Sequence, residues 1–346
     1  MAHAFERGLG SGGLEFVCMR HASGSTVTVQ LFGAHVTSLK TPSGDELLWM
    51  SSASALDGSA PIRGGIPVVF PQFGSAALPG IADGCELPMH GFARRFRWRV
   101  VAQRTREGGT LELRLELRPT DLDGAEGQAV RKAWSHDFVL RYTILLHAGT
   151  EQQLFSCTLE VHNPFPARAP ATSASRRIAN LAKTFSTSAD EGWDFQALLH
   201  TYFAVADVAR VQLHGFRAAP YFDRLTPGDA LQTEEGEMHC VERETDRVYA
   251  FSSGPLARDV LMRGTGIGSG GLRVRRVVSA GSTPDCVLWN PWVNKSKAMA
   301  DFDDWGWRNM VCIEPGLHVM PGHPPGRLVP GATATLTQII DVDDRS

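Results

Sequence analysis

Several features that would direct this chain to a charged polymer or a lipid bilayer are missing from its sequence. The 346 residues carry a net charge of only −3, and they contain no lysine-rich run of the kind found in proteins that bind nucleic acid or anionic membranes. No stretch approaches the ~18 consecutive apolar residues of a membrane span. Residues 1–7 lack the apolar core of a signal peptide. We therefore expect a cytoplasmic protein that binds neither nucleic acid nor a membrane.

The sequence also lacks the paired cysteines of zinc sites and disulfide frameworks. No C-x-x-C pair joins its six cysteines, which are Cys18, Cys85, Cys157, Cys240, Cys286 and Cys312. Such wide spacing argues against both kinds of structure. No H-x-H or H-E-x-x-H motif is present to supply histidine ligands. We expect buried, reduced thiols and no metal site.

Long amphipathic helices are missing as well, and strand-like alternation takes their place. Residues 111–118 alternate leucine with a charged side chain without a break, which predicts a strand with one wet face. Further strands are expected at Thr26–Phe32, Phe138–Leu146, Phe155–Val161, Leu272–Val278 and Ala334–Val342. Because 35 glycines and 20 prolines separate these segments, the pattern favours an all-β fold, a large antiparallel sandwich with few short helices.

One segment departs from this alternation. Residues Ala167–Glu191 are rich in Ala, Ser, Thr and Arg, and we interpret them as a surface insertion, with a lid or partner-binding arm as the functional alternative. No domain boundary or internal repeat is visible. We expect a single domain over residues 1–346.

Two Gly- and Pro-containing loops carry arginines. The first is Arg63-Gly64-Gly65-Ile66-Pro67, and the second is His90-Gly91-Phe92-Ala93-Arg94. Loops on a rigid scaffold commonly carry function, and the planar guanidinium of arginine can donate two parallel hydrogen bonds to a phosphate. In a chain close to neutral, this placement predicts a small anionic ligand.

His200 and Glu314 are candidates for proton transfer. His200 stands in the apolar, aromatic run 198–203, and Glu314 lies between apolar residues and a Pro-Gly turn. A buried glutamate has a raised pKa, and histidine titrates near neutrality. Taken alone, His200 fits a core histidine and Glu314 fits a residue that caps a turn. Together they are a plausible acid–base pair, although their spacing along the chain cannot show that they touch.

Several motifs occur together in an order that resembles a known family. They are 33–39 (Gly-Ala-His-Val-Thr-Ser-Leu), 62–67 (Ile-Arg-Gly-Gly-Ile-Pro), 90–94 (His-Gly-Phe-Ala-Arg), 199–203 (Leu-His-Thr-Tyr-Phe), 244–249 (Glu-Thr-Asp-Arg-Val-Tyr) and the run from Trp289 to Gly316. In this order the chain resembles the hexose-6-phosphate mutarotases (glucose-6-phosphate 1-epimerases), a branch of the aldose 1-epimerase superfamily. The resemblance spans roughly residues 30–340. It implies a galactose-mutarotase-like β-supersandwich with its site on one concave face.

The resemblance also implies roles for individual residues. His200 matches the family's general acid and Glu314 its general base. Arg63 and Arg94 match the residues that hold the sugar phosphate, and Asp246 matches a residue that contacts sugar hydroxyls. These matches imply that His90 faces the sugar.

The chain departs from the family pattern at two places. Met89 precedes His90 where the family commonly has Gln, so one polar contact of this substrate-binding position is expected to be lost or replaced. The insertion at residues 167–191 lengthens a connection that is short in typical members. Both departures bear on the choice of sugar.

The implied activity is the interconversion of the α and β anomers of a hexose 6-phosphate, preferably glucose 6-phosphate. The enzyme would need no cofactor because the reaction moves no electrons, and it would act as a monomer or weak dimer. Two alternatives stay open: an aldose 1-epimerase for unphosphorylated hexoses, and a non-catalytic sugar-phosphate sensor.

Three other motifs are interpreted as structural. Gly266–Gly271 fits G-x-G-x-x-G, but a strand rather than a helix is expected to follow it. Asp301, Asp303 and Asp304 are interpreted as a surface loop, and Lys295 and Lys297 as solvated lysines.

Overall fold

The computed structural model describes residues 4–75, 78–147, 154–164, 192–228, 230–251, 259–267, 271–279 and 284–343. The predicted insertion at residues 167–191 lies outside the described residues.

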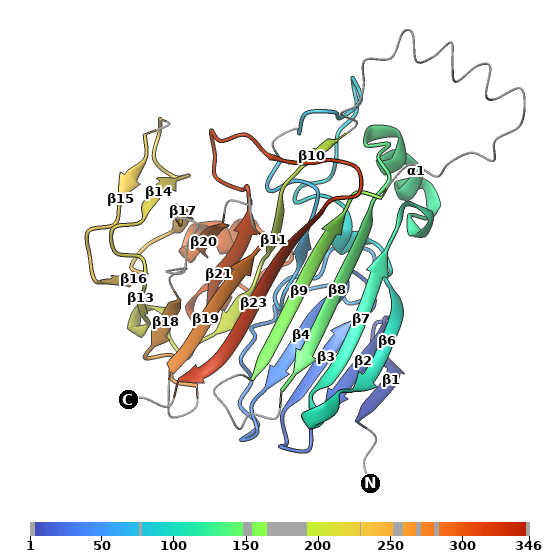
Figure 1. Cartoon of the computed structure of the whole chain (residues 1–346). Helices are drawn as coiled ribbons and strands as arrows, with labels where there is room; N and C mark the ends of the chain where they lie inside the picture. Colours follow the sequence, from blue (N-terminus) through green and yellow to red (C-terminus); the bar gives the residue numbers. More distant parts are fainter. Residues whose placement is uncertain are drawn as a thin grey trace, which may run out of the picture.

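The largest element of the fold is a nine-stranded antiparallel sheet, which runs across the front of the molecule in Figure 1. Its strands, in spatial order, are β16 (Met238–Cys240), β13 (Gln212–His214), β18 (Val260–Arg263), β19 (Gly271–Val278), β23 (Thr333–Asp343), β9 (Phe155–His162), β8 (Val139–Leu146), β7 (Leu111–Leu117) and β6 (Arg99–Thr105). Each of the long central strands pairs with both neighbours over most of its length.

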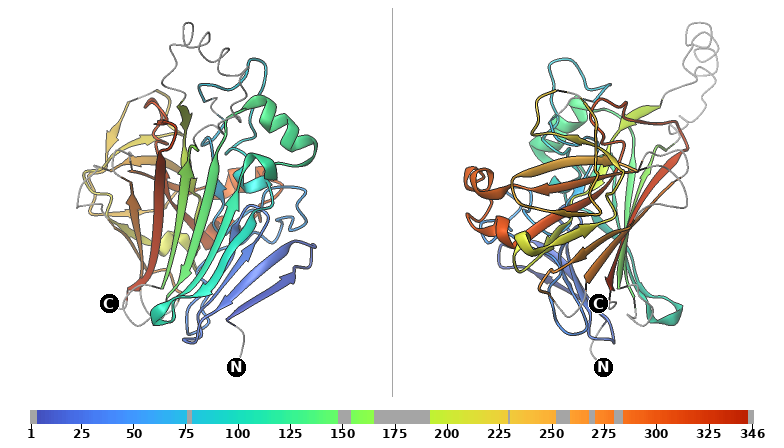
Figure 2. Two further views of the ribbon diagram at one scale, coloured as in Figure 1. Left: turned by 45° about the vertical axis from the view of Figure 1, so that its right-hand side comes forward. Right: turned by 90° about the vertical axis from the view of Figure 1, so that its left-hand side faces the viewer.

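A second, eight-stranded sheet packs against the first, as the two views of Figure 2 show. Its strands are β15 (Gln232–Thr233), β14 (Pro220–Asp223), β17 (Thr245–Ala250), β20 (Pro284–Asn290), β21 (Met310–Leu317), β11 (Ala197–Leu199) and β5 (Val68–Val69), with β12 (Tyr202–Ala204) also pairing with β21. Strands β21 and β11 contact β23 of the larger sheet, and the Thr201 hydroxyl donates a 2.7 Å hydrogen bond to the Gln338 side chain across the interface.

Smaller elements complete the fold. A four-stranded sheet contains β1 (Phe5–Leu9), β2 (Glu15–Arg20), β3 (Thr26–Gln30) and β4 (His35–Lys40), and a two-stranded sheet pairs β10 (Trp193–Phe195) with β22 (Gly326–Leu328). The α-helices among the described residues are α1 (Gly124–Ala133) and α3 (Trp292–Ala298). The all-β supersandwich with few short helices is therefore confirmed. No helix among the described residues is long and apolar enough to cross a membrane.

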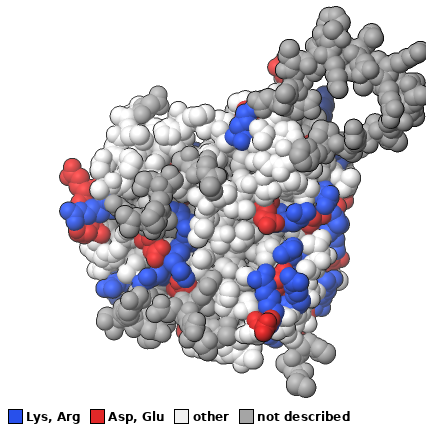
Figure 3. Space-filling view, viewed as in Figure 1, with Lys and Arg blue, Asp and Glu red and all other residues white. Residues whose placement is uncertain are grey.

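The strands predicted from alternation are present with nearly the expected bounds, but the wet face of β7 is covered. Leu111, Leu113 and Leu115 point into the core. Glu112 and Glu116 on the other face are also buried, because arginines of neighbouring strands and of the turn after β6 lie over them. Acidic and basic side chains are interspersed over this part of the surface in Figure 3. Carboxylates in the middle of a sheet face lose their exposure when each is surrounded by several arginines.

Helix α1 was not expected from the sequence. It connects β7 to β8 and lies over one end of these strands in Figure 1. Its sequence contains Gly124 and Gly127, and its N-cap residue Asp123 makes no side-chain capping bond. The local signals for a helix are therefore weak, and the buried contacts of Val130 and Ala133 hold it in place.

Candidate active site

His200, in the short connection between β11 and β12, faces Glu314 on β21 of the eight-stranded sheet. Leu198 pairs with Gly316 through β11, and Tyr202 pairs with Cys312 through β12. The two pairings share one register, which places His200 opposite Glu314. The His200 Nδ1 atom lies 3.3 Å from the Glu314 Oε1 atom. The structure thus brings together two residues that the sequence could only suggest as a pair.

Asp246 lies on the same face of this sheet. It pairs with Trp289, which pairs with Cys312, which in turn pairs with Tyr202. Residues opposite each other across strands share a face, as do residues two positions apart along one strand. Since Glu314 is two positions from Cys312, all of these side chains and His200 project to one side.

The His200 ring lies among aromatic side chains. It stacks on Tyr202 with centroids 4.7 Å apart and planes 8° apart. The rings of Trp289 and His90 meet it edge-on, at 5.8 and 5.6 Å. Phe73 in turn lies 5.3 Å from His90. These contacts fix the direction of the imidazole.

Burial controls the protonation of the pair. Glu314 is 1% exposed and His200 is 6% exposed. Although Nδ1 and Oε1 are close, their alignment does not make a hydrogen bond, and neither they nor Oε2 have another partner among the described residues. Burial, aided by Asp246, raises the pKa of Glu314 well above its ordinary value. Burial, followed by the charges of His90, Arg63 and Arg94, lowers the pKa of His200 well below its ordinary value.

These opposite shifts favour one shared proton on the pair, with that proton on the carboxyl group. In this state neither group carries a charge. A carboxyl and a neutral imidazole 3.3 Å apart can exchange a proton with a molecule placed between or above them.

Asp301 and Tyr202 hold the Arg63 side chain close to His200 and Glu314. Its guanidinium forms a two-pronged ion pair with Asp301, at 3.0 and 3.2 Å, and donates a 2.9 Å hydrogen bond to the Tyr202 hydroxyl. Burial lowers the pKa of Arg63, but Tyr202 and Asp301 outweigh that effect and raise it overall.

The backbone around Arg63 brings this loop beside His200. The His200 N–H donates to Pro67 O at 3.0 Å, and the Tyr202 N–H donates to Gly65 O at 2.9 Å. At Gly65 the φ angle is +60°, and a Cβ atom there would lie 2.2 Å from Val36 O. Only glycine fits such a conformation and such an approach.

Arg94 and Met89 belong to the second arginine loop. Arg94 is buried and donates a 2.8 Å hydrogen bond to the Met89 carbonyl, while its Nε has no partner among the described residues. Burial lowers the pKa of Arg94 to about 10, so the group is charged at neutral pH. The Met89 residue is 50% exposed, and it contributes its backbone to the site by holding Arg94.

His90 takes an unusual backbone conformation, with φ at 65°. Its Nδ1 atom accepts a 3.2 Å hydrogen bond from the Gly74 N–H, which directs the ring toward His200. Burial, followed by the charge of Arg94, lowers the pKa of His90 well below its ordinary value.

Sequence reasoning missed three residues of this cluster. Asp301 was interpreted as part of a surface loop, yet it holds Arg63. Arg224 pairs with Asp246 at 3.6 Å and lies 5.1 Å over the Phe73 ring. Tyr202 connects Arg63 to His200. Tyr202 follows His200 by two positions, which is the spacing that places both on one strand face, so alternation could have indicated it.

One group in the described part of the chain has donor atoms that could hold a metal ion. The side-chain donors of His200, Cys312 and Glu314 lie within 4.8 Å of one another. A cation there would occupy the acid–base pair and remove its proton-transfer capacity. We therefore do not assign these residues as a metal centre.

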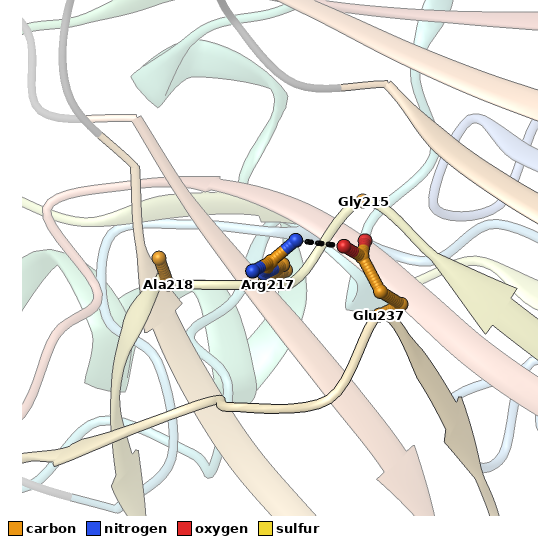
Figure 4. Close-up of a pocket in the computed structure, with 4 residues that line it drawn as sticks. All are labelled: Gly215, Arg217, Ala218 and Glu237. Carbon is orange, nitrogen blue, oxygen red and sulfur yellow. Dashed lines mark hydrogen bonds and ion pairs between the residues drawn. The ribbon is translucent and has the colours of Figure 1, made fainter.

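A surface hollow elsewhere contains none of the predicted site residues. It is lined by Gly215, Arg217, Ala218 and Glu237, and Figure 4 shows the ion pair of Arg217 with Glu237 beside it. Both charged side chains are largely exposed, so this hollow lacks the buried, reactive groups of the His200 cluster.

Comparison with known proteins assigns the fold and the family. The model of the family described as aldose 1-epimerase matches residues 15–340. The chain belongs to this family, which confirms the resemblance predicted from its motifs.

Two relatives carry a more specific name. A protein of Cenchrus ciliaris named "Putative glucose-6-phosphate 1-epimerase" is 31% identical over 307 residues, covering 88% of this chain and 78% of the relative. An Escherichia coli K12 protein with the same name is 29% identical over 286 residues, covering 82% of this chain and 77% of the relative.

Solved structures share the fold. A crystal structure titled "Crystal Structure of a putative mutarotase (YeaD) from Salmonella typhimurium in monoclinic form" superposes with a TM-score of 0.71 at 23% identity, covering 98% of this chain and 94% of the other. The galactose 1-epimerase of Lactobacillus acidophilus gives a TM-score of 0.64 at 14% identity, with 98% of each chain covered.

Proposed function

We propose that this epimerase interconverts the α and β anomers of hexose 6-phosphates, with glucose 6-phosphate preferred, by opening and closing the pyranose ring. The observation that carries the proposal is the buried pair of His200 and Glu314, 3.3 Å apart, beside two buried or half-buried arginines. The name shared by the two relatives supports the phosphorylated substrate.

Ring opening needs one proton acceptor and one proton donor. Glu314, as carboxylate, takes the proton of the C1 hydroxyl, and the electron pair left on that oxygen forms the C1 carbonyl. The C1–O5 bond breaks, and O5 takes a proton from protonated His200. After rotation about the C1–C2 bond, closure on the other face of the aldehyde reverses both transfers. Each positioned acid or base contributes about 10²–10⁴-fold.

This mechanism uses one proton on the pair throughout. The proton is on His200 when the cyclic sugar is bound and on Glu314 when the open aldehyde is bound. The neutral pair that burial favours is the form that accompanies the open aldehyde. The cyclic sugar needs the charged pair, which burial disfavours.

Arg63 and Arg94 are proposed to hold the phosphate. Both guanidinium groups affect the pKa of His200, so they lie near the pair. Asp246, with Arg224 beside it, is proposed to contact sugar hydroxyls at the other end of the site. His90 faces the His200 ring and would contact the sugar between these groups.

Two alternatives make different predictions about substrates. An aldose 1-epimerase for free hexoses would have comparable kcat/KM for glucose and for glucose 6-phosphate. A sugar-phosphate sensor would bind glucose 6-phosphate without accelerating its anomerisation. Magnetisation-transfer NMR between the anomers of both sugars separates the three cases. We expect faster exchange for both sugars and a kcat/KM at least about tenfold higher for the phosphorylated one, because two charge-assisted contacts are added.

A further inference from the structure

The surroundings of His200 conflict with the role of a general acid when no anion is bound. Arg63, Arg94 and His90 surround the imidazole with positive or potentially positive groups. The ring is also 6% exposed, so water does little to stabilise an imidazolium there. Yet protonation of the ring oxygen requires a proton on this ring.

Tyr202 lies between His200 and Arg63, one of the two arginines proposed to bind the phosphate. Its hydroxyl accepts a 2.9 Å hydrogen bond from Arg63 Nη1, and its ring lies parallel to the His200 ring at 4.7 Å. A hydrogen bond from a cation withdraws electron density from the phenol. A phenol in that state stabilises a stacked imidazolium less well than a free one would.

A dianion on Arg63 and Arg94 would reverse these effects. It would cancel two positive charges near the imidazole, and opposing charges act strongly between buried groups. Arg63 would also share its donors between the anion and its present partners, Asp301 and Tyr202. Both changes favour the protonated form of His200.

We propose, resting on the function proposed above, that the phosphate dianion activates the catalytic pair as well as anchoring the sugar. A dianion supplied as a separate molecule would then accelerate the anomerisation of a sugar that lacks a phosphate. Tyr202 is a positioning residue in this coupling, because it contacts both Arg63 and His200.

The direct test adds phosphite dianion to the full-length protein and measures anomer exchange of glucose by NMR. We expect kcat/KM for glucose to rise at least about tenfold at saturating phosphite, which corresponds to a single charge-assisted contact. Phosphite that has no effect on glucose exchange, or only inhibits it, would overturn the proposal if glucose 6-phosphate is turned over normally. If neither sugar is turned over, the proposed function itself fails, so the two failures are distinguishable.

Variants test whether Tyr202 transmits the effect of the dianion from Arg63 to His200. Tyr202→Phe keeps the stacked ring and removes the hydroxyl that Arg63 contacts. We expect a smaller phosphite activation, because glucose exchange without phosphite should already be faster, whereas kcat and KM for glucose 6-phosphate should change less. Arg95→Ala is the matched control, because Arg95 adjoins Arg94 in sequence but pairs with Glu126. This control should keep full activation. Equal activation in wild type and Tyr202→Phe would remove Tyr202 from the account.

A spectroscopic measurement follows the proton itself. The ¹⁵N resonances of His200, assigned by their absence in His200→Gln, should move toward the imidazolium position when phosphite is added. Resonances that stay at the neutral position while phosphite activates glucose exchange would contradict the proposed route through His200.

Discussion

At the scale of single residues, the site depends on charges that are removed from water. Arg63 and Arg94 are the proposed source of substrate preference, and neither is freely solvated: one is paired with Asp301, and the other is buried beneath the Met89 carbonyl. A phosphate bound there would meet guanidinium groups whose directions are already fixed. Such preorganisation lowers the cost of binding.

Replacing either arginine should weaken the preference for a phosphorylated sugar. For Arg63→Ala and for Arg94→Ala we expect the ratio of kcat/KM for glucose 6-phosphate to that for glucose to fall at least about tenfold, since one charge-assisted contact is lost. Arg97→Ala is a suitable control, because Arg97 closely follows Arg94 in sequence but forms an exposed pair with Glu15. An unchanged ratio in both arginine variants would remove them from the phosphate site.

Glu314 should reduce stability at neutral pH. Its pKa is raised in the folded state by burial, whereas in the unfolded chain it returns to about 4.3. Between these two values the unfolded chain releases a proton that the folded protein keeps, so stability falls as pH rises through this range. We expect Glu314→Gln to raise the Tm by a few degrees at pH 7–8, and the gain to vanish below about pH 4.

Calorimetric scans of wild type and Glu314→Gln across this pH range check the prediction. A gain that is constant from acid to neutral pH would show that the buried carboxyl group is not its cause.

At the scale of strands and loops, the register of β11 and β12 against β21 brings the site residues together. The strands could be predicted because alternation of buried and exposed side chains is a local property; β7, β8, β9, β19 and β23 lie where that pattern placed them. The contact between His200 and Glu314 could not be predicted from pattern, because it depends on how β11 and β12 align with β21. The sequence motifs supplied the candidates only through resemblance.

Two sets of ion pairs were not visible in the sequence pattern. Asp301 was interpreted as part of a surface loop and lies in a partly exposed turn, but it also pairs with an arginine far away in the chain. Glu112 and Glu116 were placed on a wet face, but arginines from other strands and turns cover them. These ion pairs depend on which arginines the fold places beside each carboxylate, and alternation along one strand does not show this.

The close packing of Gly65 in the first arginine loop can be tested by comparison with Gly44, a glycine that has free space around it. Gly65→Ala would place a Cβ atom 2.2 Å from Val36 O, whereas Gly44, also at positive φ, has nothing within 4 Å of an added Cβ. Both alanine variants therefore carry the cost of a positive φ, roughly 1 kcal/mol. We expect Gly65→Ala to lose clearly more stability in urea denaturation than Gly44→Ala and to raise KM for glucose 6-phosphate. Equal losses in the two variants would show that the close approach is unimportant.

At the scale of the whole molecule, two large sheets pack face to face and share one core. One side of β21 carries Glu314 and the proposed chemistry, and β21 and its neighbour β11 also contact β23 of the other sheet. A site built on the middle strands of a sheet has little freedom to shift. This rigidity suits a reaction in which the protein transfers protons at fixed atoms.

Because one core spans both sheets, we propose that residues 1–346 form a single folding unit. Differential scanning calorimetry should show one transition whose van't Hoff enthalpy equals the calorimetric enthalpy. Two separable transitions would indicate independent domains.

The most direct test of the central claim is anomer exchange of glucose 6-phosphate measured by NMR for wild type, His200→Gln, Glu314→Gln and the double variant. The account predicts that each single change slows the catalysed exchange by about 10²–10⁴-fold. The double variant should be hardly slower than either single variant, because the two groups share one proton and act as a unit. Single variants that retain wild-type exchange while remaining folded would contradict it.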